Sequence, residues 1–127
     1  MTFDSLSNKV IGCAIEVHRE LGPGLLESTY QACLAHELSR AGMRFVLQYP
    51  MPVAYKGVLL ECGYRIDLLV EDQLVLELKA VEEILGIHEA QILTYLKLAK
   101  LRTGLLINFN VPTLKQGIKR FVLSEAV

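Results

Sequence analysis

The sequence predicts an α/β fold in which a mixed central sheet is flanked by helices. Apolar residues recur at helical spacing through most of the first 41 residues, whereas residues 64–80 read as two short strands joined by a turn. A third helical pattern at 87–101 leads into an apolar strand at 103–108. A strand, a helix and a strand in this order form a right-handed unit with parallel strands, so the helices are expected to pack on one sheet.

At 127 residues the chain has the size of one ordinary domain, and no linker, repeat or low-complexity tract divides it. We therefore expect one domain over residues 1–127. No apolar run approaches the roughly 20 residues that span a bilayer. The N-terminus lacks a basic region followed by an apolar core. We expect no membrane association, no secretory signal and a cytoplasmic location.

Two helices are expected before the strands. The first begins at Asp4 or Ser5, either of which can cap a helix, and ends at the breaker Gly22-Pro23-Gly24. The second ends before Gly42, a residue that favours helix C-termini. Its first turn contains Glu27, an acid that the helix dipole alone would favour. Spacing therefore leaves open whether Glu27 has a functional role.

Proline, glycine and turn residues mark where the expected strands begin and end. Residues 44–55 are rich in β-forming residues but contain Pro50 and Pro52, which fit an edge strand or a bend. A turn at Lys56-Gly57 leads into 58–62, and the glycine that follows offers a bulge. The segment 117–123 is read either as another strand or as a short helix.

The expected hairpin at 64–80 carries the charged residues that are the main candidates for a functional site. A three-residue turn at 71–73 pairs Val70 with Leu74. Continuing this register along the two strands places Asp67 opposite Glu77. Two carboxylates therefore meet at neighbouring positions of one sheet.

Alternation predicts which side chains share a face, because residues two apart on a strand point the same way. One face of the first strand should carry Ile66, Leu68 and Val70, and the other should carry Arg65, Asp67 and Leu69. On the second strand, Val75, Glu77 and Lys79 share a face. Lys79 is therefore expected beside the two carboxylates.

Opposed side chains lie roughly 5 Å apart, where two like charges repel by about 3 kcal/mol at an effective dielectric constant of 20. Lys79 offsets part of this cost, and a divalent cation that prefers oxygen ligands, Mg²⁺ or Mn²⁺, would offset the rest. The alternative is that Asp67, Glu77 and Lys79 form only the solvated face of an amphipathic hairpin. Leu69 and Val75 on the same face argue against that alternative.

Net charge is −1, which favours no class of partner, but the charges are unevenly distributed. Residues 61–89 contain eight acids and two bases, whereas residues 97–120 contain six bases and no acid. The bases are Lys97, Lys100, Arg102, Lys115, Lys119 and Arg120. They are candidates for binding phosphate groups of nucleic acid, with a solvated charged surface as the alternative.

Cysteine and histidine suggest no metal site. Cys13, Cys33 and Cys62 are widely spaced among apolar neighbours and fit neither a zinc site nor a disulfide framework, so buried thiols are expected. His18 has no partner at ligand spacing and is expected to be an ordinary surface or helix-end histidine.

The order of these residues resembles the PD-(D/E)xK nuclease superfamily. The matching elements are Glu27, Asp67, Glu77-Leu78-Lys79 and Gln91-x-x-x-Tyr95. The segment Gly24-x-x-Glu27-x-x-Tyr30 further resembles the GxxExxY protein family, which is placed in that superfamily. The sequence departs from the superfamily's name at one position, where Ile66 replaces the proline.

The resemblance implies a restriction-endonuclease-like core and a role for each matching residue. Asp67, Glu77 and the Leu78 carbonyl would bind Mg²⁺ or Mn²⁺, and Glu27 would join the metal shell directly or through water. Lys79 would orient or help deprotonate the attacking water. Gln91 and Tyr95 would line the site and help position substrate. The alternative is that they have no functional role and belong only to the surface and the core side of their helix.

The function implied is metal-dependent hydrolysis of phosphodiester bonds in DNA, by an endo- or exodeoxyribonuclease. A second hypothesis is a non-catalytic nucleic-acid- or protein-binding module that keeps the nuclease fold, and a third is an unrelated small-molecule enzyme that uses the same cleft. A bare core of this size presents little surface to a duplex. A homodimer or a partner protein is therefore expected, with DNA favoured over RNA as the nucleic acid.

Overall fold

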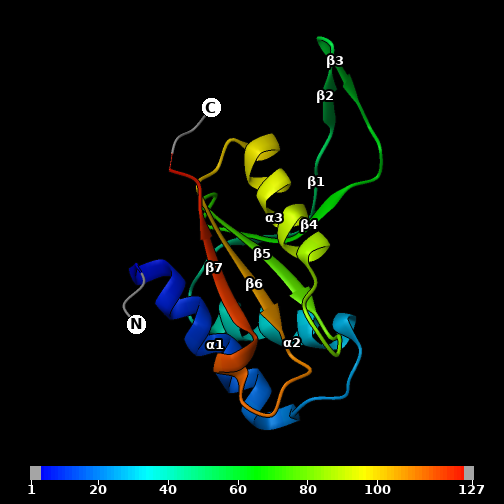
Figure 1. Cartoon of the computed structure of the whole chain (residues 1–127). Coiled ribbons are helices and arrows are strands. Elements are labelled where there is room, and N and C mark those ends of the chain that lie inside the picture. Colours follow the sequence, from blue (N-terminus) through cyan, green and yellow to red (C-terminus); the bar gives the residue numbers. More distant parts are fainter. Residues whose placement is uncertain (1–3, 125–127) are drawn as a thin grey trace.

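The computed structural model describes residues 4–124, and its mixed sheet with three α-helices confirms the predicted fold class (Figure 1). In chain order the elements are α1 Ser5–Leu21, α2 Glu27–Arg40, β1 Phe45–Pro50, β2 Val53–Tyr55, β3 Val58–Leu60, β4 Arg65–Val70, β5 Leu74–Lys79, α3 Gly86–Ala99, β6 Thr103–Asn108, the 3₁₀ turn η1 Leu114–Gly117 and β7 Ile118–Val122. No helix within residues 4–124 is long and apolar enough to span a membrane.

The main sheet has five strands in the order β1-β4-β5-β6-β7. The pairs Val70–Leu74 and Leu69–Val75 confirm the predicted register of the β4–β5 hairpin. Strands β5 and β6 are parallel and joined through α3, as the strand–helix–strand pattern predicted. The segment 117–123, for which the sequence allowed either a strand or a short helix, contains the strand β7, which pairs antiparallel with β6.

The ends of the first two helices follow local sequence signals. Asp4 caps α1, since its carboxylate accepts hydrogen bonds from the Ser7 backbone N–H at 2.8 Å and the Ser7 hydroxyl at 2.9 Å. Gly22 ends α1 with a φ of 68°, and Gly42 follows α2 with a φ of 76°, the left-handed region that glycine adopts without steric cost. The predicted boundaries of both helices are confirmed to within about a turn.

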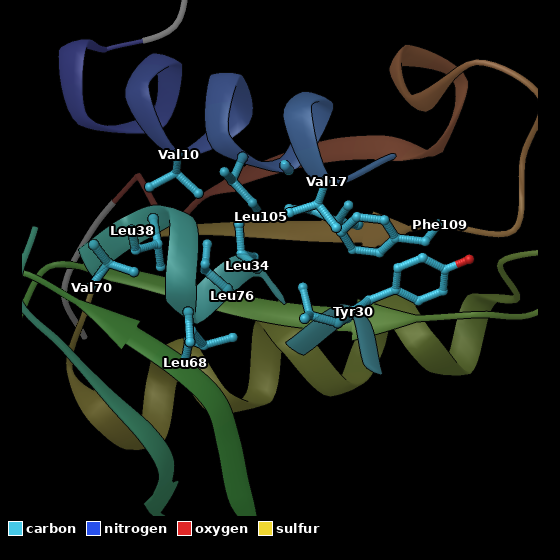
Figure 2. Close-up of a cluster of buried hydrophobic side chains, with 14 of the residues drawn as sticks. Val10, Val17, Tyr30, Leu34, Leu38, Leu68, Val70, Leu76, Leu105 and Phe109 are labelled. Atoms are coloured by element: carbon cyan, nitrogen blue, oxygen red, sulfur yellow. The ribbon is translucent and has the colours of Figure 1, made fainter. Parts of the chain in front are cut away.

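Helices cover both faces of the sheet. Helices α1 and α2 pack on one face through a buried cluster that includes ten labelled residues (Figure 2): Val10, Val17, Tyr30, Leu34, Leu38, Leu68, Val70, Leu76, Leu105 and Phe109. Helix α3 covers the opposite face (Figure 1) through Ile92 and Leu96, which pack with Val75 and Leu106. The central strands are therefore buried on both sides.

One predicted face assignment is wrong. Ile66 belongs to the α3-side cluster with Leu69, whereas Leu68 and Val70 belong to the α1/α2-side cluster. Strict alternation is therefore broken between Ile66 and Leu68. The break falls at Asp67, where the pairing of β1 with β4 is interrupted between Leu68 and Ile66.

Strands β2 and β3 form a separate two-stranded hairpin that projects from the body of the molecule (Figure 1). Its turn is at the predicted Lys56-Gly57, with φ values of 49° and 81°. Pro50 is the last residue of β1, an edge strand of the main sheet, as expected for a residue without a backbone N–H.

The structure corrects two further predictions. His18 lies in the last turn of α1, as expected of a helix-end histidine, but it is buried and not on the surface. Its Nε2 lies 2.8 Å from the Val111 carbonyl oxygen, a contact that joins α1 to the loop after β6. Cys62 is exposed in the segment that leaves the projecting hairpin, while Cys13 and Cys33 are only partly buried. Apolar neighbours in sequence did not reveal which of these side chains reach the core.

Candidate active site

The candidate site lies where β4 and β5 separate. Strand pairing between them extends from the turn to Leu68–Leu76. Beyond that pair two carboxylates bridge the strands: the Asp67 backbone N–H donates to Glu77 Oε2 at 2.9 Å, and the Leu78 N–H donates to Asp67 Oδ2 at 2.8 Å. Each acid therefore accepts a hydrogen bond from the opposite strand.

These bonds leave the other oxygen of each carboxylate for a further partner. Asp67 Oδ1 lies 3.4 Å from the Gln48 amide nitrogen, a long distance for a hydrogen bond. Glu77 is almost fully buried, at 3% exposure, while Asp67 is partly exposed. The site therefore contains one inner and one outer carboxylate.

Burial strongly disfavours the charge on Glu77. Burial, together with the neighbouring charge of Asp67, raises the pKa of Glu77 to about 8, against the lowering effects of the Asp67 N–H and of Lys79. Burial also raises the pKa of Asp67, although the Leu78 N–H, the Gln48 amide and Lys79 oppose the rise. Lys79 is thus close enough to act on both acids without neutralising them.

Glu27 is the first residue of α2 and is exposed. Its negative charge raises the pKa of both Asp67 and Glu77, so it lies within electrostatic reach of the pair. Within residues 4–124, however, no three His, Cys, Asp or Glu side chains form a group that could hold a metal ion. Glu27 therefore lies outside the compact pair formed by the other two acids.

The local sequence around Glu27 fixes the start of α2. The Tyr30 hydroxyl donates to the Gly22 carbonyl at 2.6 Å and accepts from the Leu25 N–H at 3.1 Å. The Tyr30 ring is fully buried and stacks on Phe109 with centroids 4.4 Å apart. Gly24 has a φ of 101°, which a side chain would strain. Gly24 and Tyr30 therefore shape the turn that presents Glu27.

Helix α3 contributes a linked pair of side chains. The Gln91 amide donates to the Tyr95 hydroxyl at 3.0 Å. Burial raises the pKa of Tyr95, as do the charges of Glu77 and Asp67, against the lowering effect of the Gln91 bond. The exposed Tyr64 meets Tyr95 edge to face at 6.2 Å between centroids. Gln91 and Tyr95 thus lie on the acid-bearing side of the sheet.

Several residues at the site were missed in the sequence. Gln48 on β1 donates to Gln31 on α2 at 2.6 Å and approaches Asp67. Buried Asn108 pairs in register with Lys79, and its amide bonds both backbone groups of Val81 at 2.9 and 3.1 Å. Neither Gln48 nor Asn108 belongs to a short sequence motif. For Gln31, the spacing of one helical turn from Glu27 could have indicated a position near the site.

The structure does not gather the six basic residues around the acids. Lys97, Lys100 and Arg102 lie at the C-terminal end of α3 and before β6, whose first residue pairs with Leu74 at the opposite end of β5 from Lys79. The remaining three lie on η1 and β7. Lys119 pairs with Glu89 at 2.9 Å, and Arg120 pairs with Asp4 at 2.6 Å.

The donor set fits a small oxygen-seeking cation. Mg²⁺ is typically held by one or two carboxylates and keeps several waters, and Asp67 with Glu77 supplies two carboxylates. The Lys79 carbonyl accepts a hydrogen bond from the Phe109 N–H on the β6 side. Because successive carbonyls of a strand point in opposite directions, the Leu78 carbonyl faces the gap between β4 and β5. A buried acid with a raised pKa is stabilised when a cation replaces its proton.

A mixed sheet with helices on both faces and an acidic pair beside a lysine on its central hairpin defines a nuclease-like class of protein. A family model described as the PD-(D/E)XK nuclease superfamily matches residues 4–121. The chain therefore belongs to the PD-(D/E)XK nuclease superfamily, whose members are typically metal-dependent. Comparisons with curated proteins and with solved structures gave no match.

Proposed function

We propose that this protein is a metal-dependent nuclease that hydrolyses phosphodiester bonds of DNA, and that it belongs to the GxxExxY branch of the superfamily. One observation carries the proposal: Asp67 and Glu77 face each other across two buried strands, with Lys79 beside them and no neutralising partner strong enough to keep the pKa of Glu77 low. This arrangement is costly in an apo protein and favourable around a divalent cation.

Asp67, Glu77 and the Leu78 carbonyl would hold Mg²⁺ or Mn²⁺, with Glu27 reaching the same shell through water. When bound, such an ion supplies charge neutralisation at the phosphoryl oxygens and a lowered pKa for bound water. The separation of Glu27 from the compact pair favours the water-mediated role, because no group of three acids within residues 4–124 is close enough for direct binding.

Lys79 would orient the attacking water and stabilise developing negative charge through its ammonium; only the neutral amine could accept the proton of the water. Its ammonium lies on the same strand face as Glu77 and lowers the pKa of both acids, so it is positioned to act on a water between them. Tyr95, oriented by Gln91, would donate a hydrogen bond from its hydroxyl to a phosphate oxygen. The raised pKa of Tyr95 keeps that hydroxyl protonated at neutral pH.

The charge distribution supports a second hypothesis: that the protein is a module that binds nucleic acid or protein without cleaving it. The net charge is −1, and the six bases are distributed over the C-terminal end of α3, the loop before β6, η1 and β7, away from the central hairpin that carries the acids. These bases are Lys97, Lys100, Arg102, Lys115, Lys119 and Arg120. If these bases do contact phosphates, affinity for DNA will be modest and will fall steeply as salt rises. Salt-insensitive binding would contradict a phosphate-binding role.

We further propose that the protein acts as a homodimer or with a partner protein. The β2–β3 hairpin exposes four large apolar side chains: Tyr55, Val58, Leu59 and Leu60. We assign this surface to a second copy of the chain, because a bare core of this size needs more surface to hold a duplex. Sedimentation should show a dimer for the wild type and a monomer for Leu59→Ser; a wild-type chain that cuts DNA as a strict monomer would contradict the assignment.

The test of the nuclease proposal combines calorimetric titration of Mg²⁺ and Mn²⁺ with cleavage of single-stranded, duplex and branched DNA. Asp67→Ala should lose cation binding, and Lys79→Ala should lose cleavage while retaining cation binding. Asp72→Ala is the matched control, since Asp72 is an exposed acid in the turn of the same hairpin. Cation binding without cleavage of any substrate would favour the binding module, and unchanged binding in Asp67→Ala would refute the proposed site.

A further inference from the structure

Gln48 occupies an unusual backbone position beside the candidate site. In the β1–β4 register, Leu47 pairs with Leu68 and Tyr49 pairs with Ile66, so Gln48 lies opposite Asp67 where the regular strand pairing is interrupted. Gln48 has a φ of 51°, in the left-handed region that residues with a side chain rarely adopt. Strain of this kind concentrates where a side chain must be aimed.

The side chain of Gln48 is aimed at Asp67. Its Nε2 donates to Gln31 Oε1 at 2.6 Å and lies 3.4 Å from Asp67 Oδ1. The other oxygen of Asp67 is already held by the Leu78 N–H. Rotation of the Asp67 carboxylate would therefore disturb a partner on each of its two sides.

Helix α2 supplies the support for Gln48. Gln31 lies one helical turn after Glu27, on the same helix face. The Gln31–Gln48 hydrogen bond therefore ties the acid-bearing face of α2 to the edge strand β1 and, through Gln48, to Asp67. An amide suits this place because it donates a proton without adding a charge that would compete with a cation for the carboxylate.

We propose that Gln48, held by Gln31, is a positioning residue that fixes the Asp67 carboxylate for cation binding. The inference rests on the proposed function, because it concerns the same cation site. Partners that orient ligating carboxylates typically change metal affinity by 10- to 100-fold when removed. The role requires the side chain of Gln48 and not merely its backbone conformation.

The experiment compares Gln48→Gly with the wild type and with Lys56→Gly. Glycine accepts a positive φ, so Gln48→Gly removes the amide without backbone strain. Lys56, with a φ of 49° in the turn of the projecting hairpin, is a matched position away from the site. Gln48→Gly should weaken Mg²⁺ binding about 10- to 100-fold, and cleavage should recover at saturating Mg²⁺. Lys56→Gly should leave both unchanged.

Gln31→Ala tests the support. It should weaken Mg²⁺ binding less than Gln48→Gly does, and the double variant should bind no more weakly than Gln48→Gly alone, because Gln31 acts through Gln48. Additive losses in the double variant would overturn the linked arrangement.

The outcomes separate this inference from the proposed function. If Asp67→Ala abolishes Mg²⁺ binding while Gln48→Gly binds like the wild type, the positioning role is overturned and the cation site stands. If cleavage by Gln48→Gly stays low at saturating Mg²⁺, the side chain acts on another step and the inference fails. If Asp67→Ala itself retains Mg²⁺ binding, both proposals fall together.

Discussion

The two hairpins of this protein have opposite burial patterns. The β4–β5 hairpin lies inside the five-stranded sheet, with a helix layer on each face, and carries the almost fully buried Glu77. The β2–β3 hairpin projects from the body and exposes large apolar side chains, with Leu59 at 72% exposure (Figure 1). Buried acids and exposed apolar groups are the two departures from ordinary burial that most often indicate function.

Each departure needs compensation. The buried acids are tolerated because β4 and β5 gain apolar burial on both faces, and because backbone N–H groups from the opposite strand satisfy one oxygen of each acid. Within residues 4–124, no side chain of β2 or β3 belongs to either buried cluster, and an isolated two-stranded hairpin in water is marginally stable. The first hairpin is therefore stable enough to carry a charged site, whereas the second is expected to be the less stable of the two on its own.

The largest expected contrast is in hydrogen exchange of backbone amides. Strands β4 and β5 should exchange only through global unfolding, whereas β2 and β3 should open locally at little cost. For a protein with a typical stability of 5–15 kcal/mol, the protection should differ by at least about 1,000-fold. The measurement needs a protein concentration at which the chain is monomeric. Equal protection of both hairpins would remove the contrast.

Core truncation should separate the hairpins next. Leu76→Ala removes a fully buried side chain at the centre of the sheet and should lower the free energy of unfolding by about 2–5 kcal/mol. Leu59→Ser, at the exposed tip region of the other hairpin, should change it by no more than about 0.5 kcal/mol. Urea unfolding of both variants under monomeric conditions provides the comparison. A similar loss in both would show that the projecting hairpin is part of the core.

A smaller effect is expected from the charge of Glu77 alone. With its pKa raised from 4.5 in the unfolded chain to about 8 in the folded protein, Glu77 is neutral in both states below pH 4.5. As pH rises from there to about 8, the unfolded state loses its proton first, so the free energy of unfolding should fall, by at most a few kcal/mol.

Glu77→Gln should remove this pH dependence in metal-free buffer, because the amide does not titrate. Unfolding by urea at pH 5, 7 and 8.5 is the appropriate measurement, with Glu71→Gln in the hairpin turn as the control. Glu71 has a lowered pKa, caused by the hydrogen bond from the Arg44 N–H and by the Arg44 guanidinium. A wild-type stability that stays flat between pH 5 and 8 would contradict the buried, protonated state of Glu77.

Much of the central hairpin could be predicted from sequence because its determinants are local. The polar break at 71–73 fixed the turn, the turn fixed the register, and the pairs Leu69–Val75 and Val70–Leu74 follow from it. The residues that match the nuclease motif are also close together in sequence or separated by regular helices and strands, so their order could be read from the sequence. The prediction that Asp67 and Glu77 face each other needed no tertiary information.

The missed features depend on tertiary placement. Gln48 has a positive φ opposite Asp67, and the neighbouring Ile66 packs in the α3-side cluster; a strict two-residue period predicts neither feature. His18 is buried because a loop some ninety residues later supplies the Val111 carbonyl. The six bases fall within residues 97–120 but are distributed over α3, the loop that follows it, η1 and β7. Roles of individual site residues remain predictions until variants are measured.

The most direct test of the central claim is the number of protons released when the cation binds. Titration of Mn²⁺ or Mg²⁺ into the protein at pH 7, in two buffers with different heats of ionisation, gives this number. Because burial raises the pKa of Glu77 to about 8 and a carboxyl group must lose its proton to bind a cation, we expect the wild type to release about one proton per ion. Glu77→Gln should release none. Cation binding without proton release in the wild type would show that Glu77 is either already charged or not a ligand, and would contradict the central claim.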